Sequence, residues 1–312
     1  MSISILRTAD AWWAQTQAGA VRIDTHATTT AELLADRAAI ETARTGGEAV
    51  PVESLDLASP VTAPCRVVAQ MTNFRSHVID SGMDPDTIPL TFFRKASGSI
   101  SGPYDEIVRP AHVRFLDYEV EVGLVIGHPL TVGSEVHAAN LEDYVAALVV
   151  TNDVSARDLQ LPKTQFFEAK SYPTFTPVGP VLLLLEPGEL NRFADLRLHL
   201  SVNGGTRQDK LISGDMIFPP IEALQALSRF QRLDPGDLVL TGTPMGTALS
   251  APSKIVQLIG NFLPAHVKWK AFFDKQAKNP KYLQHGDLVT ARIATDDGAL
   301  DLGTQRTTVR SA

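Results

Sequence analysis

The chain has 312 residues, 44% of them hydrophobic and 20% charged, a composition that is ordinary for a globular protein with a substantial core. Its formal net charge is −7 and no segment is rich in lysine and arginine, so the electrostatic signature of a nucleic-acid-binding protein is missing. No apolar run approaches the ~20 residues that a membrane-spanning helix needs.

The single cysteine, Cys65, excludes an internal disulfide bond and fits a reducing compartment. The first ten residues also lack the uninterrupted apolar stretch of a signal peptide. We therefore expect a cytoplasmic protein that acts without a membrane or a nucleic acid as its partner.

Residues 1–64 are expected to form a small N-terminal domain without catalytic residues. The segment 20–23 has the character of a hairpin strand, and residues 29–40 have the apolar spacing of a helix. Thr29 precedes Glu32 by three residues, which is the spacing of a capping box at a helix N-terminus. A pair of glycines and several prolines then mark a linker to the larger domain.

The most informative segment is residues 117–127, in which polar and apolar residues alternate at the start. Successive side chains point to opposite faces of a strand, so Asp117, Glu119 and Glu121 share one face while apolar residues line the other. Two carboxylates about 4 Å apart repel by about 4 kcal/mol at an effective dielectric constant of roughly 20. Such a face needs either open water or a bound cation, and the alternation by itself leaves both readings open.

A second acidic segment follows an apolar run at residues 145–150, which is expected to be a buried strand. This strand would deliver Asp153 at its C-terminal end. Ser155 is a candidate N-cap of a following turn or short helix, with Asp158 in the first turn. Two plainer readings stay open: Asp153 as a turn residue, and Arg157 with Asp158 as a surface salt bridge.

Together the two strands offer three carboxylates, from Glu119, Glu121 and Asp153. Hard divalent cations such as Mg²⁺ and Mn²⁺ prefer oxygen ligands and keep positions open for water and substrate. The three residues are therefore a candidate site for one of these two metal ions.

The rest of the chain is rich in predicted strands. Residues 196–202 alternate between apolar and polar, and the turn residues Asn203 and Gly204 predict a hairpin. His199 lies on the polar side of that strand and is expected to be an exposed structural residue. Residues 253–282 are rich in aliphatic and aromatic residues and are expected to form one or two amphipathic helices.

Several motifs, in this order along the chain, resemble those of the fumarylacetoacetate hydrolase family. They are Asp-Tyr-Glu-Val-Glu at residues 117–121, Asn-Asp-x-Ser-Ala-Arg-Asp-x-Gln at 152–160 and Thr-Gly-Thr-Pro at 241–244. Upstream, residues 73–77 are similar to the family's Asn-Tyr-Arg-x-His, and residues 93–95 to its Phe-x-Lys stretch. The resemblance runs from about Val67 to the C-terminus and is interrupted by the insertion at residues 253–282.

The resemblance implies an α+β fold: a mixed β-sandwich or β-roll as the catalytic domain over residues 65–312, and a small α/β domain over residues 1–64. It implies that Glu119, Glu121 and Asp153 bind a Mg²⁺ or Mn²⁺ ion. It also implies a small 2-oxo or β-diketo acid as the substrate, and commonly a homodimer.

The same resemblance assigns roles to further residues. His77 matches the family's base that activates water, and Asp80 stands where the family has a glutamate paired with that base, with an arm one methylene shorter. Lys170 matches a lysine beside the bound substrate, where its charge would stabilise a developing enolate. A turn at residues 241–244 is expected to hold a substrate carboxylate. The positions that match substrate contacts are Lys95, Gln160 and Thr243.

Three functions stay open at this point. The first is metal-dependent hydrolysis of a carbon–carbon bond in an acylpyruvate-like or fumarylacetoacetate-like acid, which leaves a metal-stabilised enolate. The second is another reaction through such an enolate: decarboxylation of a 2-oxo diacid, or isomerisation of a 2-hydroxy-dienoate. The third is a relative that kept the fold and lost the chemistry, against which the intact acidic set argues.

Three placements are open for the insertion at residues 253–282. It would pack on its own subunit, wall the acyl pocket or reach a partner subunit.

Overall fold

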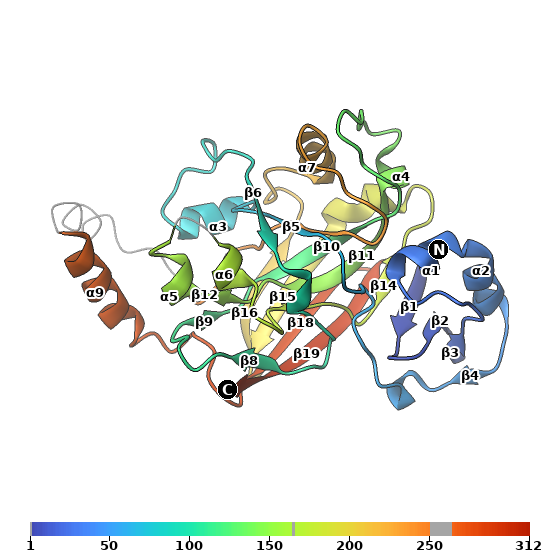
Figure 1. Cartoon of the computed structure of the whole chain (residues 1–312), viewed down its shortest axis with the longest axis horizontal. Helices are drawn as coiled ribbons and strands as arrows, with labels where there is room; N and C mark the ends of the chain where they lie inside the picture. The colour runs from blue at the N-terminus through green and yellow to red at the C-terminus, as the bar shows by residue number, and fades with distance from the viewer. Residues whose placement is uncertain (1, 164–165, 250–263) are drawn as a thin grey trace.

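The computed structural model describes residues 2–163, 166–249 and 264–312. Its two main β-sheets share one hydrophobic core, and short helices lie around them (Figure 1). This arrangement confirms the expected α+β fold. The four N-terminal strands lie at one end of the molecule, and the helix α9 (Ala265–Gln276) lies at the opposite end.

The larger sheet has ten strands. In spatial order they are β4 (Ala49–Val50), β3 (Gly19–Arg22), β2 (Trp12–Thr16), β1 (Ile3–Arg7), β14 (Leu182–Leu184), β11 (Val145–Asn152), β10 (Val120–Ile126), β17 (Leu238–Leu240), β5 (Val67–Gln70) and β6 (Phe92–Lys95). The second sheet has five, in the order β16 (Gly205–Leu211), β15 (Leu196–Val202), β18 (Leu288–Thr295), β19 (Asp301–Ser311) and β8 (Ile107–Arg109).

Smaller elements complete the described chain. Two strand pairs join β12 (Ser155–Ala156) to β9 (Leu116–Asp117), and β13 (Thr176–Pro177) to β7 (Ile100–Ser101). The remaining α-helices are α1 (Thr30–Ala35), α2 (Arg37–Thr45), α3 (Arg75–Asp80), α4 (Leu141–Tyr144), α5 (Arg157–Gln160), α6 (Phe167–Lys170) and α7 (Pro220–Leu227). Short 3₁₀ helices cover Val52–Ser54, Ser97–Ser99 and Glu189–Asp195.

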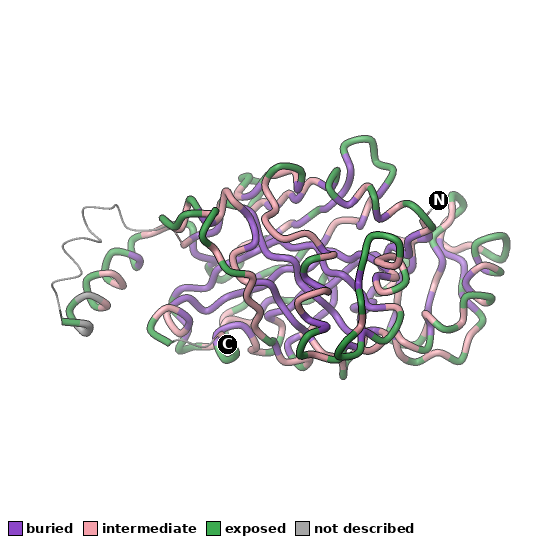
Figure 2. Tube along the Cα trace, turned by 90° about the horizontal axis from the view of Figure 1, so that it is seen from above, coloured by how far each residue is buried: buried purple, intermediate pink, exposed green. Residues whose placement is uncertain are grey.

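Strand β10 is buried on both of its faces. Val122 belongs to the core between the two sheets, together with Leu200 of β15. Val125, on the opposite face, belongs to a second core with Leu33 of α1. Figure 2 shows this continuous buried region through the middle of the molecule. The reading of this strand as one with a water-exposed acidic face is therefore wrong, since Glu121 is only 2% exposed.

The N-terminal strands continue the larger sheet. β1 pairs antiparallel with β14, so strands β1 to β4 extend the sheet beyond the strands that follow residue 64. The expected hairpin strand is β3, which pairs with β2. The division of the chain into two domains at residue 64 stays a prediction.

The expected helix over residues 29–40 is in fact two helices. The capping box at its start is confirmed, because Thr29 accepts from the backbone N–H of Glu32 and Glu32 bonds back to the N-cap. Asp36 then leaves helical geometry, with φ −99° and ψ 55°, and ends α1. Its carboxylate accepts from the N–H of Ala39 and so caps α2.

The predicted hairpin between β15 and β16 is confirmed. Asn203 and Gly204 both have positive φ, 51° and 77°, as a tight two-residue hairpin turn requires. His199 lies on the face of β15 opposite the buried leucines and is half-buried. Its structural role stays a prediction.

The insertion contains the expected helix. In α9, Phe273 stacks on Phe115 with their ring centroids 5.7 Å apart, and this anchors one side of the helix to the body of the protein. Tyr282 is 2% exposed and belongs to the main core. The expectation for residues 253–263 lies outside the described residues. No helix in the described ranges is long and apolar enough to cross a bilayer.

Candidate metal centre

The antiparallel pairing of β10 and β11 brings the three carboxylates together. Val120, the first residue of β10, pairs with Asn152, the last residue of β11. Glu119 and Asp153 directly flank this pair, and the N–H of Asp153 donates to the carbonyl of Glu119 at 2.8 Å. Glu121 is the next residue on β10. The three side chains therefore lie together where β10 begins and β11 ends.

The three carboxylates form a cluster that fits a divalent cation. One oxygen of each of Glu119, Glu121 and Asp153 lies within 4.8 Å of the others, and the residues are 5%, 2% and 0% exposed. Burial, together with the charges of Asp153 and Glu119, raises the pKa of Glu121 well above its usual value. A bound cation would favour the ionised form of Glu121, so this oxygen donor set suits Mg²⁺ or Mn²⁺.

Two buried lysines contact the cluster. Lys170 donates from Nζ to Glu119 and to Asp153, both at 2.6 Å. Burial opposes the charge on Lys170, but the attraction of these two carboxylates outweighs it and raises the Lys170 pKa. Lys95 donates to Asp153 and, at 2.8 Å, to the carbonyl of Phe175. Burial lowers the pKa of Lys95 despite the charge of Asp153.

Arg157 is a buried part of the site, which the sequence reasoning did not recognise. Its Nη2 donates to Glu119 at 2.5 Å, its Nε to Asp117 at 2.8 Å, and its Nη1 to Gln160 at 2.7 Å. Burial opposes its charge, but Glu119 and Asp117 outweigh burial and raise the Arg157 pKa. The reading of Arg157 with Asp158 as a surface salt bridge is wrong, because Arg157 is 3% exposed.

The charge on Glu119 is fixed by these neighbours. Burial alone would favour its neutral form, but the positive charges of Lys170 and Arg157 lower the Glu119 pKa. Asp117 in turn accepts from the backbone N–H groups of Ala248 at 2.7 Å and Leu249 at 3.0 Å. Arg157 therefore links a candidate metal ligand to the chain that leads into the insertion.

The segment after Asp153 differs in detail from the expectation. Ser155 lies in β12 and its hydroxyl donates to the carbonyl of Asp153 at 2.9 Å, so it does not cap a helix. The N-cap of α5 is Ala156, which has no side-chain oxygen. Asp158 accepts from the backbone N–H of Arg114 at 2.9 Å. The strand pairing of Ser155 prevails over its local capping preference.

His77 lies on α3 with a ring nitrogen that lacks a bonding partner. Its Nδ1 is buried and has no hydrogen bond among the described residues. Burial lowers the His77 pKa, and the charges of Glu119 and Arg157 also act on it, in opposite directions. Burial of the ring therefore favours the neutral imidazole. Asp80 is the last residue of α3, and the described contacts include no hydrogen bond between it and His77.

The three expected substrate contacts are all buried. Lys95 lies in the cluster described above, and Gln160 accepts from Arg157. The hydroxyl of Thr243 donates to the carbonyl of Val120 at 2.9 Å and accepts from Gln208 at 2.8 Å. Their roles toward a substrate stay predictions.

The turn at residues 241–244 holds a carboxylate of the protein itself. The N–H of Gly242 donates to Glu121 at 2.7 Å. Gly242 has φ +87°, and a Cβ at this position would lie 2.8 Å from the Cβ of Asn73, so glycine is required here. The turn thus positions a candidate metal ligand.

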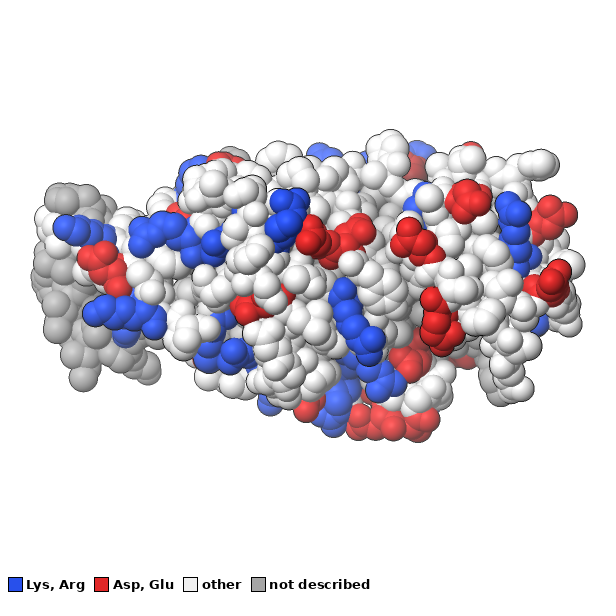
Figure 3. Space-filling model, turned by 90° about the horizontal axis from the view of Figure 1, so that it is seen from below, with Lys and Arg blue, Asp and Glu red and all other residues white. Residues whose placement is uncertain are grey.

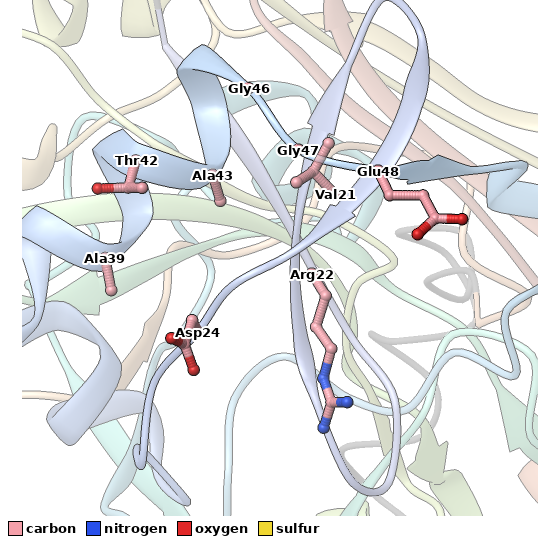
Figure 4. A pocket seen from close by; sticks show the side chains of 9 residues that line it. All are labelled: Val21, Arg22, Asp24, Ala39, Thr42, Ala43, Gly46, Gly47 and Glu48. Atoms are coloured by element: carbon pink, nitrogen blue, oxygen red, sulfur yellow. The ribbon is translucent and has the colours of Figure 1, made fainter.

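A separate pocket of about 360 Å³ lies in the N-terminal region. Figure 4 shows its charged side chains, Arg22, Asp24 and Glu48, pointing in different directions, so they do not converge on a common ligand position. On the molecular face shown in Figure 3, acidic and basic side chains are interspersed and do not form one basic patch. The buried carboxylate cluster is the better candidate for chemistry.

Comparison with known proteins finds a matching family model and several similar proteins. A family model described as "Fumarylacetoacetate (FAA) hydrolase C-terminal" matches residues 66–310. The 2,4-didehydro-3-deoxy-L-rhamnonate hydrolase of Sphingomonas sp. (strain SKA58) is 40% identical over 188 residues, 60% of this chain and 64% of that protein. A mitochondrial oxaloacetate tautomerase of Rattus norvegicus is 34% identical over 204 residues, 64% of this chain and 62% of that protein. The chain spans less than two thirds of the length of these two curated relatives.

Solved structures share the fold over the full chain. A probable 2-hydroxyhepta-2,4-diene-1,7-dioate isomerase from Mycobacterium abscessus is 28% identical with a TM-score of 0.76, over 100% of this chain and 99% of that one. The fumarylacetoacetate hydrolase of Exiguobacterium antarcticum has a TM-score of 0.70 at 24% identity, over 100% of both chains, a likeness of fold alone.

Proposed function

Because this chain belongs to the fumarylacetoacetate hydrolase family, whose members include hydrolases, isomerases and tautomerases, we propose that it is a divalent-metal-dependent hydrolase that cleaves a carbon–carbon bond. Its substrate would be a β-diketo or 2-oxo acid of the acylpyruvate or fumarylacetoacetate type. The observation that carries this proposal is the buried cluster of Glu119, Glu121 and Asp153 with Lys170 bonded to two of its carboxylates. The name of the rhamnonate hydrolase relative also favours hydrolysis.

The residues of the site divide into a metal-binding set and a proton-handling set. Glu119, Glu121 and Asp153 would hold Mg²⁺ or Mn²⁺, which supplies Lewis-acid polarisation of a substrate oxygen. His77, whose buried Nδ1 has no described partner, would accept a proton from the attacking water. The proposed role of Asp80 in orienting His77 would require its side chain to move, because the described contacts include no bond between the two residues. Lys170 would place its positive charge beside the oxygen that gains electron density when the bond breaks.

A second candidate is another reaction through an enolate: tautomerisation or decarboxylation of a 2-oxo diacid, or isomerisation of a 2-hydroxy-dienoate. The tautomerase relative and the isomerase structure favour it. All of these reactions pass through a stabilised enolate without an attacking water, and tautomerisation and isomerisation also need a base. The third hypothesis, an inactive protein that has kept the family's fold, fits poorly with the number of buried charged groups at the site. Seven buried ionisable groups would be costly to keep without a function; they are Lys95, Asp117, Glu119, Glu121, Asp153, Arg157 and Lys170.

One panel of assays separates these functions. The protein is incubated with Mg²⁺, Mn²⁺ or chelator, and pyruvate release from acylpyruvates, CO₂ release from oxaloacetate and loss of enol-oxaloacetate absorbance are recorded. We expect metal-dependent pyruvate release. Enol loss without any pyruvate release would identify a tautomerase, and no turnover of any of these acids with either metal would point to an inactive relative.

We also propose a cytoplasmic homodimer, which matches the family's usual assembly. Size-exclusion chromatography with light scattering should give about twice the 33.7 kDa mass of the chain. A monomeric mass at micromolar concentration would contradict the dimer.

Replacing His77 with alanine should lower the rate of carbon–carbon hydrolysis by about 10²- to 10⁴-fold, to a small but measurable residual rate, while leaving the metal affinity within about twofold. His77 is not one of the clustered ligands, and loss of a general base typically costs 10²- to 10⁴-fold in rate. Calorimetric titration with Mn²⁺ and the pyruvate assay together measure both effects. A parallel loss of metal binding would show that His77 is a ligand or supports one.

Shortening the insertion should change substrate preference and leave metal binding intact. Residues 253–278 are replaced by a short Gly-Ser linker, which keeps the buried Tyr282 in place. In the chain, the insertion follows the turn at residues 241–244 closely, and Asp117 accepts from the N–H of Leu249 shortly before it. Relative rates across several acylpyruvates are compared with those of the full chain. Unchanged relative rates in a folded, dimeric variant would reduce the insertion to a packing element.

A further inference from the structure

The helix that carries His77 has no cap of its own. The N-cap residue of α3 is Phe74, which offers no side-chain acceptor to the free N–H groups of the first turn. Asp215, from the loop after β16, supplies that acceptor instead. Its Oδ1 accepts from the N–H of Ser76 at 2.7 Å, and its backbone carbonyl accepts from the N–H of Arg75 at 2.7 Å.

The loop that carries Asp215 is itself fixed to the chain before α3. The N–H of Ile217 donates to the carbonyl of Asn73 at 2.8 Å, and the N–H of Phe218 donates to the Asn73 side chain at 2.8 Å. Asn73 is fully buried, and its Nδ2 donates to the carbonyl of Thr241 at 2.8 Å. Asp215 therefore caps α3 from a position that is tied to the turn holding Glu121.

Ser76 joins three segments at one hydroxyl group. Its Oγ donates to Asp215 Oδ2 at 2.5 Å and accepts from the N–H of Met245 at 3.2 Å. Met245 follows the turn at residues 241–244, and Ser76 directly precedes His77. Since the Nδ1 of His77 has no partner among the described residues, groups outside the ring must fix where the imidazole lies.

We propose that Asp215 is a positioning residue for His77: it holds the first turn of α3, through Ser76, so that the imidazole faces the carboxylate cluster. The proposal rests on the proposed role of His77 as the base. A helix of six residues is unstable alone and depends on outside contacts for its place. Without Asp215, His77 would sample positions away from the reacting water, and a displacement of about 1 Å costs on the order of 100-fold in rate.

The test combines Asp215→Ala with His77→Ala in a double-mutant cycle on the full-length, metal-loaded protein. We expect Asp215→Ala to lower kcat by about 10- to 100-fold and to leave KM and Mn²⁺ affinity within about twofold. In the His77→Ala background the same change should cost nothing further, because Asp215 acts through His77. Asp215→Asn should retain most of the activity, since its amide oxygen still accepts from the Ser76 N–H.

A matched control is Asp86→Ala. Asp86 also bonds to α3, but it contacts the exposed side chain of Arg75 at 2.8 Å and not the backbone of the first turn. This variant should keep full activity. Should Asp215→Ala unfold the protein, Ser76→Ala removes the shared hydroxyl with little change in volume and is expected to lower kcat in the same way.

A direct structural readout separates this proposal from the proposed function. Amide hydrogen exchange of residues 75–80 and the ring resonances of His77 should change in Asp215→Ala and stay unchanged in Asp86→Ala. If no substrate in the panel turns over, the proposed function fails while these measurements still test Asp215. Unchanged exchange and ring resonances, or an equal loss of activity in the His77→Ala background, would overturn the positioning role.

Discussion

Replacing Asp153 with asparagine should remove tight binding of Mg²⁺ and Mn²⁺ and, with it, all measurable turnover. Asp153 is 0% exposed, and one of its carboxylate oxygens lies within 4.8 Å of an oxygen of Glu119 and of Glu121. Loss of groups that merely support metal ligands typically costs 10- to 100-fold in affinity, so loss of a ligand should cost more than about 100-fold. Glu119→Ala should behave in the same way. Calorimetric titration with Mn²⁺ and the substrate panel measure both quantities.

The matched control for this prediction is Glu168→Gln. Glu168 is a carboxylate on α6, the helix that carries Lys170, but it is exposed and pairs with Lys163 at the surface. Its replacement should leave metal affinity and turnover within about twofold, as expected for an exposed pair. Full activity of chelator-treated Asp153→Asn protein would refute the assignment of the metal centre.

Replacing Arg157 with methionine should destabilise the protein by about 3 to 5 kcal/mol, because the change leaves the buried carboxylate of Asp117 without its positive partner and leaves Glu119 with Lys170 alone. Arg157 bonds to both Asp117 and Glu119, and all three residues are buried. The free energy of unfolding is measured by urea denaturation of the full chain. Metal affinity should also fall, since Glu119 loses one of the two cations that keep it ionised.

The matched control for this prediction is Arg197→Met, which makes the same change of size and charge at an exposed arginine. Arg197 also bonds to two aspartates, Asp209 and Asp296, but its side chain is 41% exposed. Arg197→Met should cost about 0 to 1 kcal/mol because water screens and replaces these contacts. Equal effects of the two substitutions would show that burial of the Arg157 network contributes nothing to stability.

Local patterns predicted the elements whose cause is local. The capping box of Thr29 and Glu32 is one, because its hydrogen bonds join residues three apart. The turn at Asn203 and Gly204 is another, because positive φ angles are a property of those residue types. Apolar spacing predicts one helix over residues 29–40, whereas the chain forms two helices that meet at Asp36. The side chain of Asp36 accepts a hydrogen bond from Thr25, and the spacing of apolar residues does not reveal such a contact.

The acidic cluster was predictable for a related reason. Alternation along one strand placed Glu119 and Glu121 on the same face, and the family motif supplied Asp153 on a second strand. The antiparallel register of β10 and β11 then brought all three together. The sequence left open whether that face met water or a cation. Packing excludes open water from that face, because the second sheet and the N-terminal helices cover both faces of β10.

The sequence by itself therefore determined the family, the α+β fold and the three carboxylates, since these follow from motifs and from strand periodicity. The tertiary structure alone decided which charges neutralise them. Arg157 lies 38 residues from Glu119 in the chain, and Asp215 lies 139 residues from Ser76, yet each pair is in hydrogen-bond contact. No local pattern encodes such contacts, because hydrogen bonds between distant residues form only after the sheets have packed and excluded water from the groups that need partners.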